Sequence, residues 1–144
     1  MKRRTLRYLV PVAALLAAAG CDYKESFPYQ GDELIDFTTD SLYFSFGKEP
    51  FSVTEKMMEV GVEIVGSPVS HDRGYRIRID PLRTTAQAGQ HYDALEETRT
   101  IPAGASSTTI PVRVHRLELE DETVYTLRLE LVETEDFRLG VIEG

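Results

Sequence analysis

The sequence predicts an all-β protein, an antiparallel β-sandwich of Greek-key, immunoglobulin-like architecture. Apolar and polar residues alternate in five segments after residue 40, which is the period of a strand with one buried face. Gly, Pro and Ser residues separate these segments, as turns between antiparallel strands require. Beyond the first 20 residues, no segment has apolar residues at a helical spacing.

The first three alternating segments are SLYFSF, MMEVGVEIV and GYRIRID. In each, every second residue is apolar, and the other face of the second and third segments carries charged residues such as Glu59, Glu63, Arg76 and Arg78. The predicted inward faces are Leu42, Phe44 and Phe46; Met58, Val60, Val62 and Ile64; and Tyr75, Ile77 and Ile79.

The last two clear segments are TTIPVRVH and VYTLRLELVE. Their predicted inward faces are Ile110, Val112 and Val114, and Tyr125, Leu127, Leu129 and Leu131. Pro111 lies on the outward face of its strand and has no N–H to donate, so we expect that strand at a sheet edge.

A final strand is expected to begin near Asp136, with Phe137, Leu139 and Val141 on one face. Five clear segments and this short one are fewer than the seven strands of such a sandwich. Either the weakly patterned segment Thr98–Ile101 completes the sheet, or the chain continues in its natural form. We favour the second alternative, a sandwich that lacks its last strand.

The N-terminus has the organisation of an export signal. Four basic residues (Lys2, Arg3, Arg4 and Arg7) precede twelve mostly apolar residues, Tyr8–Ala19. This run is too short to cross a hydrocarbon core, which needs about 20 helical residues, but it fits a signal peptide. The alternative is an ordinary secretory signal cut at an Ala-x-Ala site.

The small residues before Cys21 resemble the lipobox of bacterial lipoproteins, in which cleavage occurs just before a cysteine. This resemblance implies a signal peptide over residues 1–20, with diacylglycerol and an N-acyl chain covalently attached to Cys21. Ala18 departs from the Leu that is commonest at its position. Several acyl chains make the membrane anchoring stable, where one alone is marginal.

Composition excludes several functions. The formal charge of −8 becomes −12 once the four basic residues of the signal are removed, which argues against binding nucleic acid. Cys21 is the one cysteine, so with its thiol acylated no disulfide, thiolate zinc site or cysteine nucleophile can form.

The 124 residues from Cys21 to Gly144 suffice for one domain. Residues 21–39 are charged and lack periodicity, so we expect a lipidated N-terminus with a flexible tether, followed by the sandwich domain over residues 40–144. The acidic start of this tether resembles signals that send lipoproteins of Bacteroides-type bacteria to the cell surface. This implies an outer-membrane location facing the exterior.

A longer stretch, Thr85–Val114, resembles the Calx-β type of β-sandwich, in which a small-residue loop precedes a strand ending in Pro-Ala-Gly. The chain is also similar to a domain-of-unknown-function family of lipoproteins from Bacteroides-type bacteria. The matching elements are Cys21, Leu42–Phe46, Gly89–Tyr92, Ile101–Gly104 and Phe137–Gly140. The resemblance implies a fold and a location but no reaction. From the residues alone, Gly89, Pro102 and Gly104 suit turns, and Tyr92 suits a scaffold role with its ring on the core.

Catalysis has little support in the sequence. His71, His91 and His115 lack metal-ligand spacing, and no GxSxG element is present. The acids Glu96, Glu97, Glu133, Glu135 and Asp136 could be read as a glycosidase dyad, but solvated loop ends explain them better in so acidic a chain. We therefore expect no enzymatic activity.

Calcium and glycans are the remaining ligands to consider. The candidate calcium ligands are Asp72, Asp93, Glu118, Glu120, Asp121 and Glu122. His91 stands where the Calx-β pattern has an acid, so we expect no tight calcium binding and no cofactor. The chain has no Trp and no Asn, which disfavours glycan binding. We expect a surface-displayed accessory or interaction module whose partner is an outer-membrane protein complex, with a glycan-binding component of an uptake system as the alternative.

Overall fold

The computed structural model of the protein describes residues 31–140, which form a sandwich of two β-sheets. One sheet has four strands in the order β5 (Ser107–His115), β2 (Glu55–Val65), β1 (Leu34–Phe37) and β7 (Arg138–Leu139). The other has three, in the order β4 (Thr98–Ile101), β3 (Arg73–Ile79) and β6 (Leu129–Val132). The helical residues in this range form one short 3-10 turn, η1 (Phe46–Lys48). The predicted all-β sandwich is confirmed.

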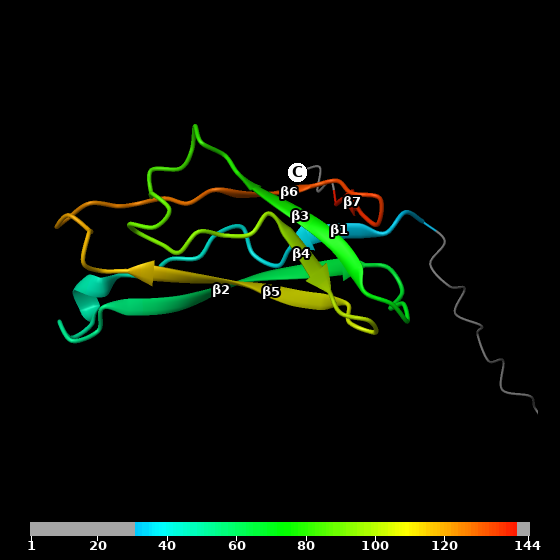
Figure 1. Cartoon of the computed structure of the whole chain (residues 1–144), viewed down its shortest axis with the longest axis horizontal. Coiled ribbons are helices and arrows are strands. Elements are labelled where there is room, and N and C mark those ends of the chain that lie inside the picture. The colour runs from blue at the N-terminus through cyan, green and yellow to red at the C-terminus, as the bar shows by residue number, and fades with distance from the viewer. Residues whose placement is uncertain (1–30, 141–144) are drawn as a thin grey trace, which may run out of the picture.

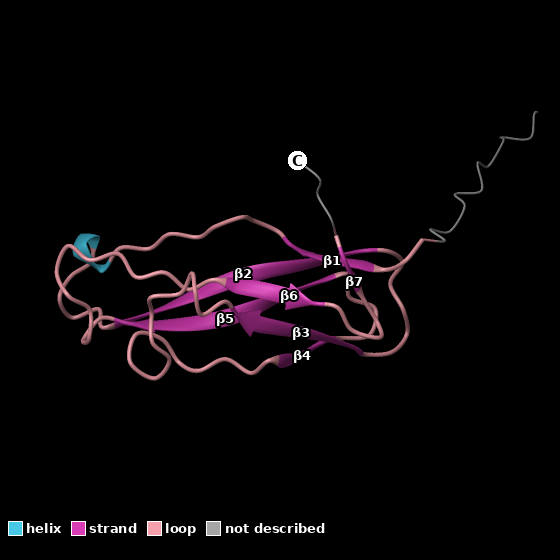
Figure 2. Ribbon diagram, turned by 90° about the horizontal axis from the view of Figure 1, so that it is seen from above, coloured by secondary structure: helices cyan, strands magenta, loops and turns pink. Residues whose placement is uncertain are grey.

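Neighbouring strands are antiparallel except β1 and β7, which are parallel. The long β2–β5 ribbon spans most of the molecule (Figures 1 and 2), and its register joins Glu55 to His115 at one end and Glu63 to Ser107 at the other. The chain enters at the right of Figure 1, at β1, whereas η1 and the loop after β5 lie at the left. We call the left end the distal end.

The core lies between the sheets and is built by the inward faces that alternation predicts. Tyr75 and Ile77 of β3 face Val62 and Ile64 of β2 and Ile110 of β5, and all five are buried. Burying apolar area of this kind stabilises the fold by about 25 cal/mol per Å². The predictions for β2, β3 and β5 are therefore confirmed, and β5 does lie at a sheet edge, as Pro111 indicates.

Two predicted strands are wrong in whole or in part. Residues 41–45 form no strand, and the 3-10 turn η1 begins at Phe46, because the chain leaves β2 after the Thr38 N–H···O=C Gly61 bond of 3.0 Å. Leu42 is consequently 46% exposed. The segment predicted over 124–133 is a strand only in β6, Leu129–Val132, since β3 ends at Ile79 and offers no further ladder.

The tether prediction for residues 21–39 is wrong over Leu34–Phe37, which form β1 and place Ile35 in the core. Thr98–Ile101 forms β4, the alternative we disfavoured for that segment, with Ile101 fully buried. The final strand is present as β7, and Phe137 beside it is buried. Val141, Cys21 and the predicted signal peptide lie outside the described residues. The Greek-key, immunoglobulin-like detail of the fold remains a prediction.

Candidate binding groove

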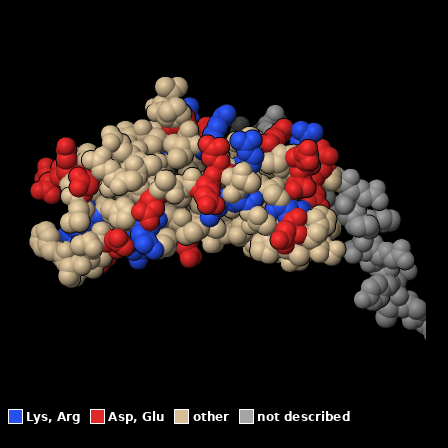
Figure 3. Space-filling view, viewed as in Figure 1, with Lys and Arg blue, Asp and Glu red and all other residues tan. Residues whose placement is uncertain are grey.

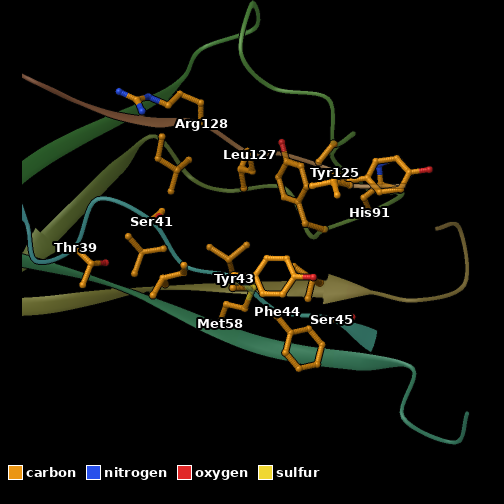
Figure 4. Close-up of a pocket in the computed structure, with 18 of the residues that line it drawn as sticks. Thr39, Ser41, Tyr43, Phe44, Ser45, Met58, His91, Tyr125, Leu127 and Arg128 are labelled. Atoms are coloured by element: carbon orange, nitrogen blue, oxygen red, sulfur yellow. The ribbon is translucent and has the colours of Figure 1, made fainter. Parts of the chain in front are cut away.

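A groove of about 1320 Å³ lies between the two layers of the sandwich. One wall consists of the extended segment Thr39–Ser45 together with Met58 and Val60 of β2. The opposite wall consists of Tyr125–Leu131 and the loop that carries His91 and Tyr92. Figure 4 shows both walls, with Tyr43 and Met58 on one side and Tyr125 and Leu127 on the other. The groove therefore lies between segments about 80 residues apart in the sequence.

Apolar side chains line much of the groove and remain partly exposed. Tyr43 is 77% exposed and Phe51 is 91% exposed, although both are large. Phe37, Phe44, Met58, Leu127, Leu129, Leu131 and Leu139 are half-buried on its walls. A contiguous apolar surface that water can reach indicates a binding site in a soluble domain.

The wall formed by residues 39–44 has unused backbone groups. Within residues 31–140, no hydrogen bond involves the N–H or C=O groups of Thr39–Phe44. Paired backbone is the rule in folded proteins, and an extended segment with free N–H and C=O groups is an open strand edge.

The backbone of the opposite wall has hydrogen-bond partners along one of its two edges. Thr126 and Arg128 are tied to the 83–86 loop: their N–H groups donate to the hydroxyls of Thr85 and Thr84, both at 2.9 Å. The Thr126 carbonyl accepts from Thr85 N–H at 2.9 Å. Because successive residues of an extended chain direct their backbone groups to opposite sides, those of Tyr125 and Leu127 face the groove.

The His91 loop closes one part of the groove and has a structural explanation. Gly89 has φ of 80° and donates its N–H to the Tyr92 carbonyl at 2.7 Å. His91 is buried, accepts the Gln87 N–H on Nδ1 at 2.9 Å, and stacks on Tyr125 with ring centroids 4.2 Å apart. Tyr92 is 3% exposed, and burial raises the pKa of its phenol. The scaffold role predicted for this loop is confirmed for the Tyr92 ring.

The candidate calcium ligands are not brought together. Asp72 accepts the Ala103 N–H at 2.8 Å, and Asp93 contacts His115 Nε2 at 2.6 Å. Glu118 and Glu120–Glu122 lie in the loop after β5, at the distal end. Across residues 31–140, no group of three or more His, Cys, Asp or Glu side chains is arranged to hold a metal ion.

The acids considered for a glycosidase dyad serve structural contacts in three cases. Glu97 pairs with Arg76 at 3.6 Å, Glu133 pairs with Arg138 at 3.0 Å, and Asp136 accepts the Gly74 N–H at 2.9 Å. No helix in the described range has the length and apolar character of a membrane span. The groove itself escaped the sequence analysis, because alternation in 41–46 and 124–131 does not reveal that these segments lack backbone partners.

Comparison with known proteins gives a family but no activity. Searches of curated proteins and of solved structures gave no match. A family model described as "Domain of unknown function (DUF4843)" matches residues 22–144, which is most of the chain. The protein therefore belongs to the DUF4843 family of domains of unknown function.

Proposed function

We propose that the protein is a lipid-anchored, surface-displayed accessory module of the outer membrane that binds a partner and performs no catalysis. The observation that carries this proposal is the groove, with its exposed apolar lining and unused backbone edges. These features are suited to recognition by contact, and such contact needs no reacting groups.

The position of the groove supports display on a membrane anchor. The described chain begins beside β1 at the right of Figure 1, and the residues that line the groove include Ile35 of β1 as well as Glu120–Tyr125 at the distal end. A lipid on Cys21 would hold the molecule from the β1 side and leave the distal mouth facing outward. The resemblance to lipoproteins of Bacteroides-type bacteria and to Calx-β sandwiches supports the same location and fold.

The membrane anchor is tested with Cys21→Ser in cells. The unmodified protein is expected to incorporate a fatty-acid probe and to remain in the membrane fraction, whereas Cys21→Ser loses both properties because no thioether can form. Ser67→Cys in the Cys21→Ser background is the matched control, since it restores a thiol away from the lipobox and should not restore labelling. Labelling of Cys21→Ser at the normal level would contradict the anchor. Protease treatment of intact cells then distinguishes surface display from a periplasmic position.

A glycan is the second candidate ligand. Tyr43 and Tyr125 place two aromatic rings on the groove, and Asp40 and Glu120 supply carboxylates beside them. Rings with neighbouring carboxylates are what a sugar site needs, although the chain has no Trp or Asn. Screening the lipid-free chain against a glycan array and against its own membrane extract separates the two candidates. Turnover of a saccharide would overturn both, because each is non-catalytic.

A further inference from the structure

The groove has the features of a site that lacks one β-strand. Its two long walls, Thr39–Ser45 and Tyr125–Leu131, are each seven residues of extended chain, or about 23 Å. Within residues 31–140, the N–H and C=O groups of Thr39–Phe44 are unused, and Tyr125 and Leu127 alternate with the residues that are tied to the 83–86 loop. In β6 the same alternation continues: Asp80 N–H donates to the Arg128 carbonyl at 3.0 Å, so the backbone groups of Leu129 and Leu131 also point away from β3.

The floor of the groove would accept the side chains of such a strand. Half-buried apolar residues of both layers, among them Met58, Val60, Leu127 and Leu129, line the interior, while solvent lies on the outside. An added strand with apolar residues at every second position would place those residues inward and the polar ones outward. The added strand would cover the part of the apolar lining that is exposed to solvent in the free protein.

The parallel pairing of β7 with β1 points to one direction for the added strand. β7 pairs with β1 in parallel, with Leu34 opposite Arg138 and Ile35 opposite Leu139. A strand beside residues 39–45 in the same parallel sense runs toward the distal end, and it is then antiparallel to β6. Because the two walls run in opposite directions, such a strand pairs in parallel with residues 39–45, as β7 does with β1, and in antiparallel with β6.

The negative charge at the distal mouth favours basic residues at the end of the added strand that lies there. Glu120, Asp121 and Glu122 line this mouth, and none of them forms an ion pair with another described residue. Arg116, the nearest cation in sequence, donates instead to the carbonyls of Pro50 at 2.6 Å and Val53 at 3.0 Å. Figure 3 shows acidic residues gathered at the left tip, beyond a largely uncharged surface. Basic residues at the leading end of the strand would be attracted there.

Within residues 31–140, every alternating segment other than the two walls is already paired in a sheet, so none of them is free to fill the groove of a second copy. Each of the alternating segments β2, β3 and β5 is already paired in a sheet and buries its inward face. The segments at residues 39–45 and 125–128 form the walls themselves. A donor from another polypeptide fits the groove better than a second copy does.

We propose that the groove binds an extended segment of a partner protein by β-strand addition, with alternating apolar residues inward and basic residues at the C-terminal end beside Glu120–Glu122. This inference rests on the proposed role as an interaction module and specifies its ligand. The strand would hydrogen-bond to residues 39–45 on one side and to Tyr125–Leu131 on the other.

The test uses synthetic peptides and the lipid-free chain, Cys21→Ser. The probe is a nine-residue fluorescent peptide that alternates Val and Thr and ends in two Lys, and its binding is followed by fluorescence anisotropy. The controls are the reversed sequence and the same peptide N-methylated at alternate residues, which removes the hydrogen-bond donors of one edge. We expect the probe to bind at least about tenfold more tightly than either control.

A protein variant tests the groove edge directly. Ser41→Pro removes an N–H that has no partner in the free protein, so it should leave the melting temperature nearly unchanged and weaken peptide binding about tenfold. Ser70→Pro, in the β2–β3 loop away from the groove and at an N–H that likewise has no partner among the described residues, is the matched control and should bind normally. If Ser41→Pro fails to fold, the N-methylated peptide still decides the question.

Each other outcome overturns the proposal in a recognisable way. Equal binding of the probe and both controls means nonspecific adsorption. Binding only after removal of residues 141–144 means that the chain's own C-terminal residues compete for the groove. A dimer in sedimentation that the peptide dissociates means that the occupant is a second copy. If the peptide does not bind but the protein captures a glycan or a membrane protein, β-strand addition is refuted while the proposed role as an interaction module is retained.

Discussion

At the scale of single residues, the least expected side chain is Arg73, which alternation places on the inward face of β3 beside Tyr75 and Ile77. It is 3% exposed, pairs with the Glu33 carboxylate, and donates to the Ala105 carbonyl at 3.3 Å. Its guanidinium carbon lies 5.1 Å from the centre of the Phe137 ring. Arg73 thus joins the start of β1, the turn before β5 and the residue that leads into β7.

We expect Arg73→Ala to lower the free energy of unfolding by about 2–4 kcal/mol. A buried pair costs about 3–5 kcal/mol when one partner is removed, and Glu33 is 28% exposed, which reduces the penalty. Arg76→Ala is the matched control on the same strand, where the pair with Glu97 is exposed and contributes about 0–1 kcal/mol. Urea unfolding measures both, and equal losses would contradict the structural role of Arg73.

Two buried tyrosines make stability depend on alkaline pH. Burial raises the pKa of the Tyr75 phenol, partly offset by the Arg99 guanidinium, and burial raises the pKa of Tyr92. Above about pH 10 the unfolded state loses these protons while the folded state retains them, so the free energy of unfolding falls as pH rises. Below that pH the contribution is fully present.

The prediction is checked by urea midpoints measured between about pH 8 and pH 11. The decline should be shallower in Tyr75→Phe and in Tyr92→Phe, because phenylalanine has no proton to lose. Tyr43→Phe, whose ring is 77% exposed, is the control and should follow the unmodified protein. Three identical profiles would show that the tyrosines do not carry the effect.

At the scale of elements, the sequence predicts strands well where the alternation of apolar and polar residues is long. It predicts them poorly where strand formation depends on whether a neighbouring strand is available for pairing. β2, β3 and β5 each have at least seven residues of regular alternation and are confirmed. Leu34–Phe37 was not predicted as a strand and Thr98–Ile101 was disfavoured as one, because a segment of four residues is too short to show a clear alternation. Segment 41–46 has good alternation, yet nothing in its side chains reveals that its backbone has no neighbour.

Close approach of β1 and β2 depends on Gly61. A Cβ at this position would contact Thr38 Oγ1 and lie 3.0 Å from Thr38 Cγ2 and 3.2 Å from Thr38 Cβ. Rotation of the threonine cannot relieve the last contact, so the strands must separate where Thr38 N–H donates to the Gly61 carbonyl.

We therefore expect Gly61→Ala to cost about 1–3 kcal/mol, the range for overpacking. Gly47→Ala serves as the control, since the nearest atom to its new Cβ is Ser45 Oγ at 3.4 Å and the cost should stay within about 0.5 kcal/mol. Adding Thr38→Gly to Gly61→Ala should recover part of the loss, after allowance for Thr38→Gly alone. Thermal melting compares these four variants with the unmodified protein, and a neutral Gly61→Ala would refute the packing argument.

At the scale of the whole molecule, the fold places Asp72 at the opposite end of the sandwich from the other candidate calcium ligands. The loop containing Asp72 follows β2 and lies at the end where Val65 pairs with Leu34, whereas Glu120–Glu122 follow β5 at the distal end. Asp93 is held at the distal end by His115 and lies 3.9 Å from the Arg113 guanidinium. A calcium ion needs about six to eight oxygen ligands at roughly 2.3–2.6 Å, so all of its ligands must lie in one cluster.

We accordingly expect millimolar calcium to change the melting temperature of the lipid-free chain by only about 1–2 °C. A ligand stabilises the folded state by RT ln(1 + [L]/Kd), which is small when the dissociation constant exceeds the calcium concentration. Acids at the distal mouth will attract any divalent cation weakly, so magnesium at equal concentration, with ionic strength matched by sodium chloride, is the control. A shift of many degrees with calcium alone, abolished in Asp121→Ala/Glu122→Ala, would mean that the loop after β5 rearranges to gather ligands that are apart in this structure. Equal small shifts with both ions would mean that Asp121 and Glu122 act only through their negative charge at the mouth of the groove and do not form a calcium site.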